Sequence, residues 1–112
     1  MKRPLAMLAL LLPLAALACG EVVTVQTRDG TTTRIVLVVP PGAKAALVLL
    51  PGGGGHLALD AQGCPRKLQG NSLVRSQALF HAAGLATALV DAPSDHAGED
   101  GLGAFRAQAA HA

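Results

Sequence analysis

The sequence is poor in aromatic and charged residues. It contains no Trp, no Tyr and only two Phe, and charged residues make up 14% of its 112 positions. Because nucleic-acid binding needs clustered cations and benefits from aromatic side chains that stack on bases, this composition disfavours nucleic acid as a partner. The hydrophobic content of 51% excludes a disordered tail and predicts a largely aliphatic core. The length allows one domain at most.

The N-terminal segment has the order of a secretory signal peptide. A cationic start, Met1-Lys2-Arg3, precedes an apolar run from Leu5 to Leu17 that is short for a membrane span, and small residues close it. We therefore predict that residues 1–18 are a signal peptide and that the protein is exported, to the periplasm, the medium or the cell envelope. An uncleaved anchor helix is the alternative.

Cys19 lies directly after this segment, and two fates are open for it. Leu17-Ala18-Cys19-Gly20 resembles a bacterial lipobox, which implies lipidation of Cys19 and membrane attachment through it. Cys64 would then be a lone thiol. Alternatively, Cys19 pairs with Cys64 in an oxidising compartment.

Two β-branched runs follow, over residues 21–27 and 33–39. The Asp-Gly pair at 29–30 is a turn signal between them, so we expect an antiparallel hairpin. The apolar run 45–50 predicts a third strand, buried on both faces of a parallel sheet.

A helix and a further strand complete the expected elements. Asn71 or Ser72 is placed to cap a helix over 73–83, and Gly84 to end it. The apolar run 85–90 then predicts a strand parallel to the third one, in a βαβ unit. Residues 57–70 are irregular and too polar for core, and residues 103–112 resemble the start of another helix.

The stretch on which the functional reading depends is Pro51 followed by Gly52–Gly55 and His56. Four glycines are entropically costly to order, which is tolerable where bare backbone must approach a ligand. Ligands bind at the carboxyl ends of strands in open α/β sheets, so we expect this loop to offer N–H donors to an anionic oxygen. A flexible surface turn is the alternative. A phosphate cradle is disfavoured because neither G-x-x-x-x-G-K-[ST] nor G-x-G-x-x-G opens directly into the helix.

The order of elements resembles the N-terminal half of an α/β-hydrolase. The resemblance rests on the hairpin, a strand ending in Leu49-Leu50-Pro51-Gly52-Gly53-Gly54-Gly55-His56, the helix, and a strand ending in Val90-Asp91-Ala92-Pro93. In that family the loop after the third strand supplies oxyanion-hole amides, often within a His-Gly-Gly-Gly motif. The resemblance implies that residues 19–112 are the N-terminal part of such a domain, incomplete at the C-terminus, with oxyanion-hole amides on Gly53 and Gly54. Here Pro51 stands where the motif has its histidine, and His56 follows the glycines.

No catalytic triad is expected in this chain. The family needs a serine in G-x-S-x-G, and Gly70-Asn71-Ser72-Leu73-Val74 has only the first half of that motif. Ser94-Asp95-His96 contains the three residue types of a triad, but neighbours on one turn cannot align as nucleophile, base and orienter. We expect His56, Ser94 and His96 at most to line a pocket.

The histidines show no metal-ligand spacing, so we expect no metal and no cofactor. The resemblance implies the N-terminal portion of an exported serine hydrolase that acts on an ester or other acyl bond of a small acyl-bearing substrate. The chain alone is expected to be inactive. A small non-catalytic envelope lipoprotein or binding module is the alternative.

Overall fold

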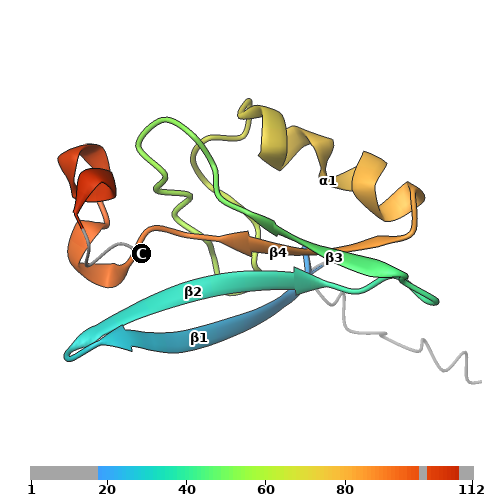
Figure 1. The fold of residues 1–112 in the computed structure, drawn as a ribbon, viewed down its shortest axis with the longest axis horizontal. Coiled ribbons are helices and arrows are strands. Elements are labelled where there is room, and N and C mark those ends of the chain that lie inside the picture. The colour runs from blue at the N-terminus through green and yellow to red at the C-terminus, as the bar shows by residue number, and fades with distance from the viewer. Residues whose placement is uncertain (1–17, 99–100, 109–112) are drawn as a thin grey trace, which may run out of the picture.

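The computed structural model describes residues 18–98 and 101–108. It forms a mixed α/β fold with one four-stranded sheet and one α-helix (Figure 1), so the predicted α/β class is confirmed at that level. The elements in chain order are β1 (Glu21–Arg28), β2 (Thr31–Val38), β3 (Ala45–Leu49), α1 (Ser72–Ala82), β4 (Leu85–Val90) and the 3-10 helices η1 (Ser94–His96) and η2 (Gly103–Ala107). The expected signal peptide and the end of the expected C-terminal helix lie almost wholly outside the described residues.

Strands β1 and β2 form the predicted antiparallel hairpin. The chain turns at Asp29 and Gly30, where Gly30 has a φ of 70°, a left-handed conformation that glycine adopts without a Cβ penalty. Thr31 and Thr33 of β2 are buried, whereas most of β1 is exposed. The hairpin therefore contributes mainly β2 to the interior.

Strand β4 lies inside the sheet, which has the order β1-β2-β4-β3. It pairs antiparallel with β2 and parallel with β3, the latter from Ala45 opposite Leu85 to Leu49 opposite Leu89. The predicted parallel pair is thus confirmed. Leu89 is fully buried, in a cluster with Val36, Leu49, Leu57 and Leu59.

The expectation that β3 is buried on both faces is wrong. Among the described residues β3 is an edge strand, and Val48 and Leu50 are 67% and 60% exposed. Leu49 is the only buried residue of the strand. A short apolar run predicts a strand, but its place in the sheet depends on partners distant in sequence.

Helix α1 packs against β4 on one side of the sheet (Figure 1). It begins and ends one residue earlier than the predicted 73–83. Asn71 is the N-cap, and its side-chain oxygen accepts from the N–H of Leu73 at 3.0 Å. Gly84, with a φ of 79°, follows the C-cap and donates its N–H to the His81 carbonyl, as its glycine signal predicted.

The main hydrophobic core combines the sheet with the loop that precedes α1. Leu57 and Leu59 of that loop are 0% and 6% exposed and pack with Val36, Leu49 and Leu89. The expectation that residues 57–70 contribute nothing to the core is therefore wrong. Burial of two leucines fixes the loop over the sheet, because each fully buried leucine contributes about 1.5–3 kcal/mol.

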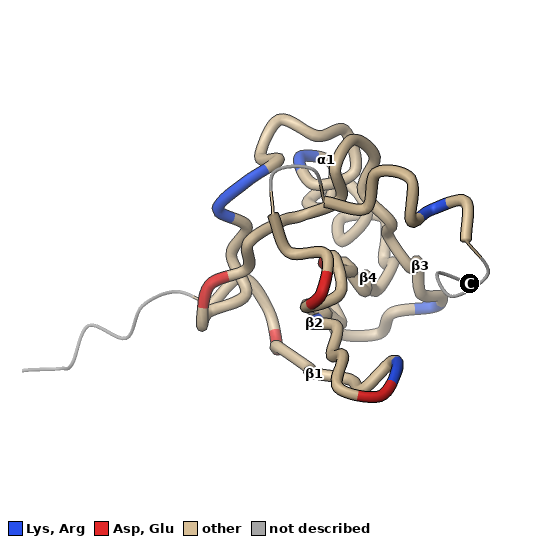
Figure 2. The backbone as a smooth tube through the Cα atoms, turned by 90° about the vertical axis from the view of Figure 1, so that its left-hand side faces the viewer, with Lys and Arg blue, Asp and Glu red and all other residues tan. Residues whose placement is uncertain are grey.

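A second, smaller cluster lies at the carboxyl end of β4 and contains Ala92, Leu102 and Phe105. Phe105 lies in η2 and Leu102 is its N-cap, so this segment is a 3-10 helix rather than the start of an α-helix. Residues 109–112 lie outside the described part of the chain. Within the part of the chain that the structure describes, basic residues are dispersed along the backbone and form no continuous stripe (Figure 2).

Candidate functional site

The loop Gly52–Gly55 is held by hydrogen bonds to its carbonyl groups. It follows the carboxyl end of β3, and residues of the distant C-terminal segment bind it. The Arg106 guanidinium donates to the carbonyl oxygens of Gly53 and, at 2.8 Å, of Pro51. The N–H of Leu102 donates to the Gly54 carbonyl at 2.7 Å. Because these contacts hold the loop in place, it does not resemble the flexible surface turn that was the alternative.

Anchored carbonyls also fix the direction of the neighbouring N–H groups. A peptide unit is planar and normally trans, so each C=O points opposite to the N–H of the following residue. The bonds to Pro51, Gly53 and Gly54 therefore turn the N–H groups of Gly52, Gly54 and Gly55 away from Arg106 and Leu102. None of the three donates to another residue in the described ranges.

Gly55 is buried, and a buried N–H without a partner is rare in proteins. Its φ of 72° and its surroundings exclude a larger residue, because an added Cβ would lie 2.7 Å from Leu102 Cδ1 and 2.9 Å from Arg106 Nη2. The position thus requires glycine for both conformation and space.

A pocket of about 480 Å³ lies beside this loop, and we name it the loop pocket. Its walls are largely apolar and include Leu50, Val90 and Phe105. Gly52 and Gly55 contribute backbone to its lining, whereas Gly53 and Gly54 do not line it. The pocket is within the size range of small-molecule sites.

The Asp91 carboxylate organises the polar side of the site. It is 8% exposed and accepts three backbone N–H groups, from Leu57 at 2.7 Å, Leu59 at 3.3 Å and Ala92 at 2.8 Å. Because β3 and β4 are parallel, their carboxyl ends meet at one edge, and Asp91 after β4 reaches the segment that follows β3. Asp91 therefore ties the loop after the glycines to the end of β4.

The His56 imidazole lies against this carboxylate. Its Nδ1 is 3.6 Å from Asp91 Oδ1, is buried, and has no hydrogen-bond partner among residues 18–98 and 101–108. His56, Asp91 and Ser94 all line a second pocket of about 250 Å³, which we name the histidine pocket. Two of the three expected pocket residues are thus brought to one place.

His96, the third expected pocket residue, lies elsewhere. Its ring stacks on Phe105 with 4.0 Å between ring centroids, and it lines neither of the two pockets described above. The neighbouring Asp95 binds Arg28 through both carboxylate oxygens, at 2.9 and 2.8 Å. The adjacent residues Ser94, Asp95 and His96 therefore lie in three different surroundings.

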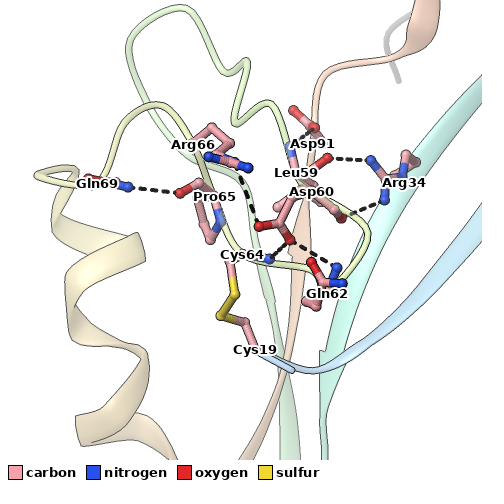
Figure 3. A network of polar contacts seen from close by, with 10 residues as sticks. All are labelled: Cys19, Arg34, Leu59, Asp60, Gln62, Cys64, Pro65, Arg66, Gln69 and Asp91. Carbon is pink, nitrogen blue, oxygen red and sulfur yellow. Dashed lines mark hydrogen bonds and ion pairs between the residues drawn. A yellow bond between two sulfur atoms is a disulfide. The ribbon is translucent and has the colours of Figure 1, made fainter. Parts of the chain in front are cut away.

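Cys19 and Cys64 form a disulfide (Figure 3), the second of the two fates that the sequence left open. The N–H of Cys19 also donates to the Gln62 carbonyl at 2.8 Å. The Asp60 side chain accepts the N–H groups of Gln62 and Cys64, each at 2.9 Å. The N-terminal end of the described chain is therefore fastened to the loop before α1.

Arg34 fastens the same loop to the sheet. From β2 its guanidinium donates to the carbonyl oxygens of Leu59 and Asp60 (Figure 3). It has no ion pair with a carboxylate among the residues that the structure describes.

Sequence reasoning did not single out Asp91, Arg34 or Arg106 as site residues. For Asp91 a signal existed, since it directly follows the strand predicted to be parallel to β3. Arg34 sits in an alternating strand pattern, and Arg106 in an alanine-rich segment, so neither carried a signal.

No family model, curated protein or solved structure matches this chain. Within the described ranges, no helix has the length and apolar content to cross a membrane. The same ranges hold no group of three or more His, Cys, Asp or Glu side chains suited to a metal ion.

Proposed function

We propose that the chain is the N-terminal part of an exported serine hydrolase of the α/β-hydrolase type, which acts on an ester or other acyl bond. In this proposal the glycine loop donates N–H groups to the oxyanion of the acyl-transfer intermediate. The nucleophile elbow comes from sequence that the present chain does not contain. The substrate is a small acyl compound whose reacting carbonyl binds at the glycine loop.

The observation that carries the proposal is the anchoring of the glycine loop. Acyl transfer places negative charge on a carbonyl oxygen, and fixed N–H donors stabilise that charge without reorganisation. Arg106 and Leu102 hold the loop carbonyls, and the N–H groups of Gly54 and Gly55 remain without a partner in the described chain. The loss of one such donor from a working oxyanion hole costs about 3 kcal/mol.

Titration of the ¹⁵N-labelled chain with butyrate tests the proposal, because the carboxylate supplies an anionic oxygen to the loop. We expect saturable downfield shifts of the Gly54 amide, with the Gly53 or the Gly55 amide as the second donor. Gly70, a loop glycine with open space around it, is the internal control. Butanol, which is uncharged, controls for occupation of the apolar walls.

Uniform or absent amide shifts in the glycine loop would overturn the assignment. Chemical-shift changes at the amides of both Gly53 and Gly54 would support the register implied by the family motif. Changes at those of Gly54 and Gly55 would support the register that the anchored carbonyls favour.

A non-catalytic binding module is the second candidate, and the open edge of β3 favours it. Exposed strand edges bind extended peptides by adding a strand to the sheet. The lipoprotein form of this alternative has a further requirement. The disulfide occupies Sγ of Cys19, so a lipid can join that sulfur only when the pair with Cys64 is absent.

A further inference from the structure

The histidine pocket gathers the three residue types of a catalytic triad from two separate segments of the chain. His56 follows the glycine loop, whereas Asp91 directly follows β4 and Ser94 begins η1 three residues later. This is the arrangement that the contiguous run Ser94-Asp95-His96 cannot provide, because nucleophile, base and orienter must approach one another through their side chains.

Asp91 and His56 have the geometry of an orienter and a base. Three backbone N–H groups fix the carboxylate, so its position does not depend on the histidine. Nδ1 of His56 faces it at 3.6 Å and is buried without another partner. Catalytic hydrogen bonds are often long before a ligand is bound. With Nδ1 turned to Asp91, Nε2 on the far side of the ring is the nitrogen left for the pocket.

Ser94 supplies the candidate nucleophile, and Arg34 adds a positive charge to the same pocket. The Ser94 oxygen accepts the N–H of Thr32 at 3.1 Å, a contact that stabilises negative charge developing on that oxygen. Its hydroxyl proton has no acceptor among the described residues. Arg34 lines the same pocket, and its cationic guanidinium donates to backbone carbonyls rather than to a carboxylate.

We propose that Ser94, His56 and Asp91 form a nucleophilic serine site that accepts acyl or phosphonyl groups from small activated esters. Ser94 Oγ forms a bond to the electrophilic carbon or phosphorus, and the bond to the leaving group breaks. The hydroxyl proton passes to His56 Nε2, and Asp91 balances the imidazolium charge. The leaving alcohol then takes this proton, or fluoride departs without it. This site departs from the expectation that the chain holds no nucleophile, and it requires neither the glycine amides nor any sequence outside the chain.

Labelling with a fluorophosphonate probe, followed by peptide mass spectrometry, tests this proposal directly. The chain has three serines, Ser72, Ser76 and Ser94, and no Tyr that would compete for the probe. We expect one label per chain, located on Ser94 and absent in Ser94→Ala. The variants Ser72→Ala and Ser76→Ala are matched controls that retain labelling.

The labelling rate of His56→Gln distinguishes a serine that is activated by a base from one that is only exposed to the probe. His56→Gln should lower the labelling rate by about 10²–10⁴-fold, the usual contribution of a general base. Asp91→Asn should also lower it, with thermal unfolding measured in parallel, because this carboxylate holds the loop as well. No label on Ser94, equal labelling of all three serines, or a rate unchanged in folded His56→Gln would each overturn the proposal.

Discussion

Replacing Cys64 by serine removes the covalent link between the N-terminal end of β1 and the loop before α1. The two cysteines are 45 positions apart, so the bond closes a long ring in the unfolded chain. The loop-entropy relation gives about 4 kcal/mol of stabilisation for a ring of this size. We expect Cys64→Ser to lose most of that amount, since the backbone bond from Cys19 to Gln62 restrains the end only weakly once the crosslink is gone.

This loss is large against the whole free energy of unfolding, which for single domains is about 5–15 kcal/mol. With a urea dependence of about 1–2 kcal/mol per molar, the midpoint should fall by about 2–4 M. Urea unfolding of the wild type, with and without reductant, and of Cys64→Ser measures the effect. The variant should not respond to reductant, because it has no disulfide to break.

Thiol alkylation before reduction supplies the matching chemical readout. The disulfide leaves neither cysteine free to react, whereas lipidation of Cys19 would leave Cys64 reactive. A wild-type midpoint that reductant does not move, together with a Cys64 thiol that alkylates at once, would refute the reasoning.

The other two predictions concern the glycine loop and the sheet edge. Gly55→Ala should destabilise the protein by about 1–3 kcal/mol, as overpacking does, because its Cβ would meet Leu102 at 2.7 Å. Gly70→Ala, with nothing within 4 Å of its Cβ, should unfold as the wild type does, and equal midpoints for both variants would contradict the anchored loop. Val48→Lys should reduce concentration-dependent association in sedimentation velocity, since a charge on an open edge strand opposes strand pairing. Its stability should change by less than about 0.5 kcal/mol. Leu79→Lys, at an exposed position of α1 away from both sheet edges, is the control for added charge alone, and an equal effect of the two lysines would contradict a role for the β3 edge.

The elements that could be predicted from the sequence are those with local causes. The Asp29-Gly30 turn, the Asn71 cap and the Gly84 terminus each depend on the chemistry of a few neighbouring residues. The parallel pairing of β3 and β4 follows from the βαβ order, which is also a near-neighbour rule.

The features that could not be predicted depend on contacts between distant segments. Leu57 and Leu59 are buried because Asp91, more than thirty positions away, accepts their N–H groups. The edge position of β3 depends on which strands are present to flank it. The anchoring of the glycine loop depends on Arg106, which lies in a segment without periodic pattern.

The candidate site shows both cases. That the glycine loop lies at the carboxyl end of a strand followed from the sequence. The meeting of His56 with Asp91 could have been deduced, because residues that follow parallel neighbours reach the same edge of a sheet. The arrival of Ser94 in the same pocket could not, since it depends on the 3-10 turn that η1 makes after Pro93.

The sheet order has a consequence for synthesis. Of the strands in the described residues, β4 comes last in sequence, yet it lies between β2 and β3, so these two strands do not touch before Leu85–Val90 has been made. At about 5–20 residues per second, the ribosome needs about 2–8 s to extend the chain from the end of β3 to the end of β4. Throughout that interval the β1–β2 hairpin and β3 are not joined by strand pairing. During that time the exposed edges of β2 and β3 are open to pairing with other chains.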